Sequence, residues 1–270
     1  MGIIEFISTY DFLIYALVVG ALVALCAALL GTSLVLRRLS MIGDGLSHVA
    51  FGAVTLAAAL NAQPLYVALP IVIIAAFLLL RAGEKGVGGD SGIAIISTSA
   101  LAIGVIIVSL TSSSVDMTSY LFGSILSVTA SDLPLSIALC ALVLLLYIFF
   151  YNKIFAVTFD ESFAKATGIR TSLYNMLIAA LTAVTIVLGM RLMGAMLISC
   201  FIIFPSLTSM KLAKTFKVVI ASSAVLSVVS VVLGIVISCL VDNMPTGAVI
   251  VAVNLVFYLV ASVIARIKKR

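Results

Sequence analysis

The sequence predicts an all-α, polytopic membrane protein whose single domain, residues 1–270, crosses the bilayer about nine times. Of its 270 residues, 64% are hydrophobic and only 9% are charged, whereas a soluble domain carries about 25% charged residues. The mean hydropathy is +1.39. Apolar runs recur at close to the roughly 20 residues that a helix needs to cross about 30 Å of hydrocarbon. These runs do not alternate apolar and polar residues as membrane β-strands do.

Polar and basic stretches between the apolar runs set the limits of the expected helices. The stretch 81–91, rich in glycine and charge, predicts a flexible loop. The short segment 117–130 predicts a re-entrant or surface helix rather than a full crossing. Eight to nine spans are therefore expected. In chain order they are 12–36, 41–60, 64–80, 93–111, 132–151, 171–190, 192–210, 218–241 and 246–265.

The basic residues orient these spans. With the limits given above, 14 of the 15 lysines and arginines fall on one side, and only Arg191 falls on the other. The positive-inside rule makes the basic side cytoplasmic, so the amino terminus, with Glu5 and Asp11, lies outside and the carboxyl terminus inside. Topology explains the net charge of +5, and no nucleic-acid partner is expected. Arg191 either repels cations or pairs with Asp116 or Asp242.

The most informative feature is a pair of ionisable residues, Asp44 and His48, in the second expected span. His48 is the only histidine of the chain, and Asp44 is one of ten acidic residues. A helical spacing of four places both side chains on one face, about 6 Å apart, where they can hold one cation between them. Ionisable groups in a membrane span are costly, so they indicate an ion or proton pathway. A purely structural hydrogen bond between the two side chains is the alternative.

The donor atoms and the missing motifs narrow the class of protein. One carboxylate oxygen and one imidazole nitrogen suit Zn²⁺ or Mn²⁺, whereas Mg²⁺ and Ca²⁺ prefer oxygen ligands throughout. A secondary transporter driven by protons or sodium ions would show repeated halves, which we do not find. An intramembrane metallopeptidase needs a ligand set such as HExxH, which one histidine cannot supply. No glycine precedes a lysine, so there is no P-loop, and the chain is not expected to be an enzyme.

A second informative stretch precedes the sixth span and predicts a short cytoplasmic helix at about 158–170. Thr158 or Asp160 can cap its first turn, because short polar side chains accept hydrogen bonds from the free N–H groups there. Asp160 and Glu161 complement the positive end of the helix dipole. Gly168 suits the end of the helix.

The same stretch has an apolar face. Phe159 and Phe163 are four residues apart, so on one helix they are expected to lie side by side. Two interpretations remain open for this helix. It is either an ordinary interfacial helix or a docking helix that receives a push from a soluble partner.

Together these stretches resemble a known family. The chain is similar to the membrane permease subunits of ATP-binding-cassette importers for zinc, manganese and related metals. The matching motifs follow the family order and cover roughly residues 30 to 255. They are RRLSMIGDGLSH (37–48), LFGSILS (121–127), the stretch 159–169, the stretch 193–205 and DNMPTG (242–247).

The resemblance implies a function and a set of partners. It assigns metal contact to Asp44 and His48, and coupling to the ATPase to the stretch from Phe159 to Gly168. The expected protein is a multi-pass permease of a prokaryotic cell membrane that imports a divalent metal without a resident cofactor. Its partners would be cytosolic ATPase subunits, an extracytoplasmic metal-binding protein and a second permease copy. The coupling residues are Phe159, Asp160, Glu161, Phe163 and Gly168.

The resemblance also gives a preference for the cargo. Manganese-type relatives tend to have a proline shortly after the histidine, whereas the sequence here runs from Val49 to Ala53 as VAFGA. Zinc is therefore expected ahead of manganese or iron. This preference follows from the family pattern alone.

Overall fold

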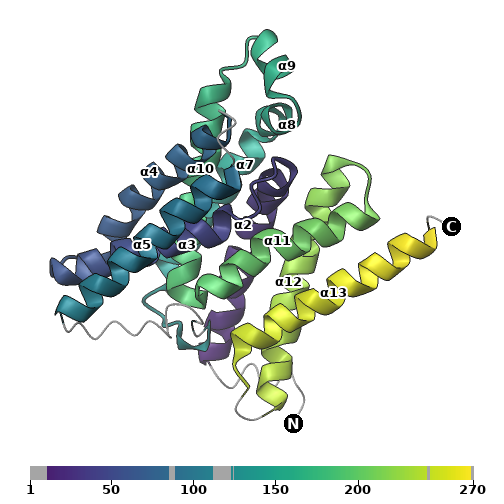
Figure 1. Cartoon of the computed structure of the whole chain (residues 1–270). Helices are drawn as coiled ribbons and strands as arrows, with labels where there is room; N and C mark the ends of the chain where they lie inside the picture. The colour runs from purple at the N-terminus through teal and green to yellow at the C-terminus, as the bar shows by residue number, and fades with distance from the viewer. Residues whose placement is uncertain (1–10, 85–88, 112–122, 124, 242–243, 269–270) are drawn as a thin grey trace.

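The computed structural model describes residues 11–84, 89–111, 123, 125–241 and 244–268 (Figure 1). All regular elements in these ranges are helical, so the predicted all-α class is confirmed. The predicted motifs at 121–127 and 242–247, the segment 117–130 and the loop 81–91 lie partly outside the described residues. The helices are α2 (Asp11–Leu36), α3 (Ile42–Ala59), α4 (Pro64–Glu84), α5 (Gly89–Thr111), η1 (Ile125–Ser127), α7 (Leu133–Phe149), α8 (Tyr151–Phe159), α9 (Glu161–Ala166), α10 (Thr171–Met193), α11 (Ala195–Leu212), α12 (Phe216–Leu240) and α13 (Thr246–Lys268).

Each of the nine expected spans coincides with one of these helices. By length and composition, seven of the described helices can cross a membrane: α2, α3, α5, α10, α11, α12 and α13. The apolar part of α4, Pro64–Leu80, is shorter. Helices α7 and α8 are bent by 69° at their junction and pass the same test only together. The expected fifth span is therefore a helix that turns sharply at Phe150, where the prediction had continued it to residue 151.

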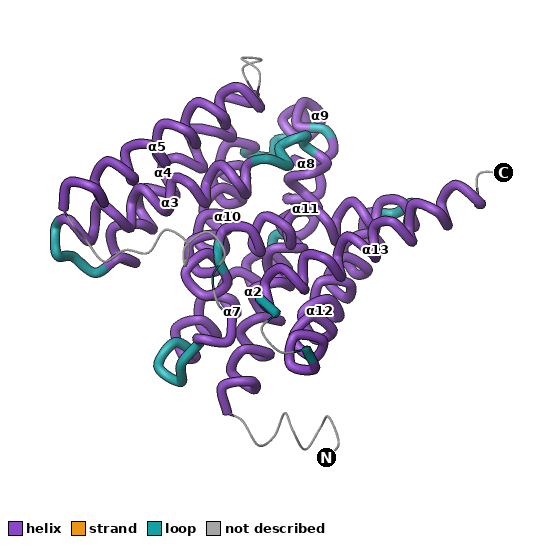
Figure 2. Tube along the Cα trace, turned by 60° about the horizontal axis from the view of Figure 1, so that its bottom comes forward, coloured by secondary structure: helices purple, strands orange, loops and turns teal. Residues whose placement is uncertain are grey.

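The helices form two flanking groups around a central set. Helices α3, α4 and α5 pack together on one flank, and α11, α12 and α13 pack together on the other (Figures 1 and 2). Between them, α2 contacts α11 and α12, while α10 contacts α4 and α2. The short helices α8 and α9 lie beyond one end of this bundle (Figure 1). Of the seven candidate spans, the central helix α10 is the most buried, and α5 and α13 are the most exposed.

Side-chain contacts show which helix ends share a side of the bundle. The Nη2 atom of Arg37, just after α2, lies 3.4 Å from Oε2 of Glu161 on α9. The ring of Phe216, which starts α12, packs against aromatic rings of α8. At the other end, Arg191 in the last turn of α10 pairs at 3.0 Å with Asp132, which precedes α7. These contacts place Arg37, the stretch 153–170 and the stretch 211–217 at one end and Arg191 at the other, in agreement with the predicted topology. Which end faces the cytoplasm stays a prediction.

Close helix packing depends on single glycines. A Cβ atom at Gly31 of α2 would lie 2.2 Å from the backbone oxygen of Ile202 on α11. A Cβ atom at Gly52 of α3 would lie 2.7 Å from the backbone oxygen of Ala100 on α5. Both distances are far below van der Waals contact, so neither position can hold a side chain without moving a helix. Small residues that allow such close approach are typical of helix contacts in membranes.

We predict that Gly31→Ala destabilises the protein, because the added methyl group overlaps the backbone of α11. Overpacking of this kind costs about 1–3 kcal/mol. The matched control is Gly92→Ala on α5, where an added Cβ would meet nothing within 4 Å. Thermal unfolding in detergent, followed by circular dichroism and by size exclusion, measures both variants. Equal melting temperatures for the two would contradict the close approach of α2 and α11.

Candidate metal site and coupling segment

The pair predicted from spacing comes together near the start of α3. Asp44 lies in the first turn of this helix and His48 one turn further on. His48 Nε2 is 3.6 Å from Asp44 Oδ2, so both side chains share one face of the helix as expected. The side chain of His48 is 19% exposed and that of Asp44 is 44% exposed. The pair is thus within two turns of the α2–α3 connection.

Neighbouring contacts fix this part of α3. Ile42 and Leu46 are fully buried, and α3 packs along α5 and α4. Ser47, between the two candidate ligands, is also fully buried. Its hydroxyl donates a hydrogen bond to the backbone oxygen of Gly43 at 2.8 Å. Ser47 therefore belongs to the helix scaffold, and the open polar groups of this turn are those of Asp44 and His48.

The pair can supply only part of a metal coordination shell. Within the part of the chain that the structure describes, no group of three or more His, Cys, Asp or Glu side chains could hold a metal ion. A structural zinc site usually has four protein ligands. Two ligands instead suit a transit position, because conduction requires an ion to leave as well as to bind.

The predicted coupling helix differs from the structure in its limits. The helix expected at 158–170 is interrupted at Asp160, whose backbone is extended with φ −148° and ψ 96°. Helix α8 ends before this residue, and α9 covers only Glu161–Ala166. Asp160 Oδ1 accepts a hydrogen bond from the backbone N–H of Phe163 at 2.8 Å. Asp160 is therefore the N-cap, whereas the alternative cap, Thr158, is buried within α8.

The end of α9 agrees with the prediction for Gly168. This glycine has φ +83°, in the left-handed region that favours glycine. Its N–H donates to the backbone oxygen of Lys165 at 3.1 Å, and the N–H of Ile169 donates to that of Ala164 at 3.0 Å. This pair of bonds is the Schellman motif. Caps at both ends allow a helix of six residues, which would be marginal alone, to have a fixed position.

The two phenylalanines do not lie on one helix, so the predicted side-by-side arrangement is wrong. The extended backbone of Asp160 separates Phe159, the last residue of α8, from Phe163 on α9. The ring of Phe159 packs against those of Phe155 at 4.8 Å and Phe216 at 5.6 Å. Phe159 therefore joins α8 to α12. Phe163 is 65% exposed and Phe159 is 59% exposed, so exposure alone does not separate them. Phe163 is the better candidate for contact with a partner because it lies on the capped helix α9, whereas the ring of Phe159 also packs on Phe155 and Phe216.

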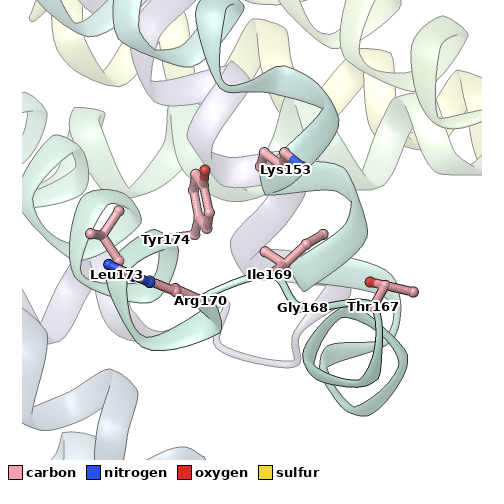
Figure 3. A pocket seen from close by; sticks show the side chains of 7 residues that line it. All are labelled: Lys153, Thr167, Gly168, Ile169, Arg170, Leu173 and Tyr174. Carbon is pink, nitrogen blue, oxygen red and sulfur yellow. The ribbon is translucent and has the colours of Figure 1, made fainter.

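A small cavity lies beside α9, between α8 and the first turns of α10. Its volume is about 250 Å³. Lys153 and Arg170 bring two positive charges to its rim, and Tyr174 contributes a phenol ring (Figure 3). Gly168 and Ile169 line it from the turn after α9. The surface around the short helix is therefore basic as well as apolar.

The partner of Arg191 was not among those predicted. Arg191 pairs with Asp132 Oδ1 at 3.0 Å, and Asp132 Oδ2 also accepts a hydrogen bond from the Thr129 hydroxyl at 2.7 Å. Asp116 and Asp242, the partners considered from the sequence, lie outside the described residues. Arg191 is thus held by the residue that precedes α7.

Comparison with known proteins identifies the family. The model of the ABC 3 transport family matches residues 9–265, so the chain belongs to this family. The manganese import system permease protein ScaB of Streptococcus gordonii is 30% identical, with 97% of this chain and 94% of that protein covered. The high-affinity zinc uptake system membrane protein ZnuB of Haemophilus influenzae is 29% identical, with 93% and 97% covered.

A solved structure supports the same assignment. PsaBC from Streptococcus pneumoniae, in complex with Fab, matches with a TM-score of 0.85 and 29% identity. The match covers 96% of this chain and 94% of that one. The all-α, polytopic permease fold is therefore the fold of this chain, and the chain is a multi-pass membrane protein.

We predict that Asp160→Ala loosens α9, because it removes the acceptor of the N-terminal hydrogen bond. Loss of an N-cap costs about 1 kcal/mol. Asp160→Asn is the matched control, since asparagine caps helices about as well as aspartate. Hydrogen exchange of the amides in 161–169 is the measurement. We expect faster exchange in the alanine variant only, and equal protection in both variants would contradict the capping role.

Proposed function

We propose that the chain is the membrane permease of an ATP-driven importer that carries a divalent transition metal ion inward. The single observation that carries this proposal is the 3.6 Å approach of Asp44 and His48 in a membrane span. An oxygen donor and a nitrogen donor at that distance suit a divalent transition metal ion such as Zn²⁺ or Mn²⁺. Membership of the ABC 3 transport family supports the same role.

Zinc remains the favoured cargo of the proposal, ahead of manganese and iron. This preference for zinc rests on the family pattern after His48, where this chain has Val49 and no nearby proline. The relatives do not settle the cargo, because they include both manganese and zinc permeases, and the two described above are 30% and 29% identical to this chain. Competition between the two ions in one uptake assay decides between them.

The partners of the proposed importer follow from what this chain lacks. Without a P-loop, it needs cytosolic ATPase subunits to supply the energy. We propose that these subunits bind at α9 and the basic surface beside it, on the cytoplasmic side. An extracytoplasmic metal-binding protein would deliver the ion at the opposite end, where Arg191 lies. A second copy of the chain would complete a two-fold permease.

We predict that Asp44→Ala and His48→Ala each abolish metal uptake by the assembled importer, because each removes one of the two donors. Ser47→Ala is the matched control on the same helical turn, since its hydroxyl is bonded to the backbone of Gly43. Uptake of radioactive Zn²⁺ and Mn²⁺ into proteoliposomes is the measurement, with size exclusion to verify folding. Normal uptake by the Asp44→Ala, His48→Ala double variant would overturn the proposed site.

We also predict that Phe163→Ala weakens binding of the ATPase subunit while the chain still folds. Burial of one aromatic ring contributes roughly 1.5–3 kcal/mol, so affinity should fall by about ten- to a hundredfold. Phe159→Ala is the comparison variant, because its ring packs within the chain against Phe216. It should lower thermal stability more than affinity. Unchanged copurification of the ATPase with the Phe163→Ala chain would rule out docking through this ring.

A further inference from the structure

A polar cluster joins α9 to the end of α2 and to the start of α10. Arg37 follows the last residue of α2, and its side chain is only 11% exposed. Its Nη2 atom donates a hydrogen bond to Asn175 Oδ1 of α10 at 2.7 Å. The same atom lies 3.4 Å from Glu161 Oε2, at the first position of α9, and 3.5 Å from the backbone oxygen of Val157.

Asn175 closes the cluster. It is 5% exposed, and its Nδ2 atom donates to Glu161 Oε1 at 3.3 Å. Both oxygens of the Glu161 carboxylate are thus bonded, one to Arg37 and one to Asn175. The three residues come from α2, α9 and α10, and each contacts the other two. Loss of the carboxylate partner of a nearly buried guanidinium strongly destabilises a folded protein. The cluster therefore holds the end of α2, α9 and α10 together.

The cluster is also close to the candidate metal site along the chain. Arg38, next to Arg37, has φ +60°, which lets the N–H of Leu39 bond to the backbone oxygen of Leu34 at 2.9 Å. The N–H of Ile42, the first residue of α3, then donates to the oxygen of Leu39 at 3.1 Å. These two backbone hydrogen bonds link the end of α2 to the start of α3. A displacement of the backbone at Arg37 can therefore be transmitted through these two hydrogen bonds to the first turn of α3, which carries Asp44.

We propose that Arg37, Glu161 and Asn175 are positioning residues that carry movement of α9 to the metal pair Asp44 and His48. The proposal rests on the proposed function, since α9 must be the helix on which the ATPase acts. None of the three residues is proposed to contact the metal or the ATPase. Their role is to transmit a displacement of α9 to the α2–α3 connection.

The test measures coupling rather than activity alone. The full importer, with its ATPase subunits and delivery protein, is reconstituted in liposomes with Glu161→Gln, which keeps the shape but removes the charge that Arg37 needs. The readout is the number of Zn²⁺ or Mn²⁺ ions imported per ATP hydrolysed. We expect this ratio to fall at least about fivefold, the lower end of typical coupling between sites. A merely structural role would lower import and hydrolysis together and leave the ratio unchanged.

Three further variants complete the design. Arg266→Gln, which removes an exposed charge on α13, should leave the ratio unchanged. Asn175→Ala disrupts the same cluster without altering a charge. If Glu161→Gln does not fold, the ratio is measured with Asn175→Ala in its place. Arg37→Gln combined with Glu161→Gln should be no worse than either change alone, because the residues act as one unit.

The outcomes separate this proposal from the function on which it rests. An unchanged ratio in both Glu161→Gln and Asn175→Ala would overturn the coupling role while leaving the importer intact. Loss of ATPase binding in Glu161→Gln would also overturn it, by assigning Glu161 to docking. Absence of ATP-driven metal import by the unaltered complex would instead refute the proposed function.

Discussion

The arrangement of the end of the bundle that carries α9 depends on the need to compensate one nearly buried positive charge. Arg37 cannot reach bulk water with most of its side chain, so the chain must bring acceptors to it. Glu161 and Asn175 do so from α9 and α10. In meeting this need, the chain brings the end of its first described helix against the start of α10 and gives the six-residue α9 a tertiary anchor between its two caps.

What could be predicted from the sequence was local. The spacing of Asp44 and His48 fixes their common face once a helix forms, and the structure brings them to 3.6 Å. The cap and the ending of α9 depend on backbone groups within a few residues. Asp160 was one of the two caps considered, and Gly168 was the predicted ending. Each of the nine apolar runs likewise coincides with a described helix, and seven of these helices can cross a membrane by length and composition, because hydrocarbon leaves a membrane-spanning chain few alternatives to helix.

What could not be predicted depends on contacts distant in sequence. A cap at Asp160 implies a non-helical backbone at that residue, but the sequence did not show that a separate helix, α8, would end directly before it. The partner of Arg191 is 59 residues away in the sequence. Asn175 is the only strongly polar side chain early in the sixth span, a signal that would have suggested a polar partner for Arg37. Such residues could be recognised in the sequence, but their interaction partners could not be predicted from it.

The close approach at Gly31 constrains how the protein can change shape. Where backbone meets backbone, there are no side-chain rotamers that could exchange one packing for another, so α2 and α11 cannot slide past each other in small steps. The same holds for α3 and α5 at Gly52. Helices joined in this way behave as rigid pairs. Any alternation between outward and inward openings must then take place at the seams where larger side chains interdigitate, with each glycine-joined pair moving as one body.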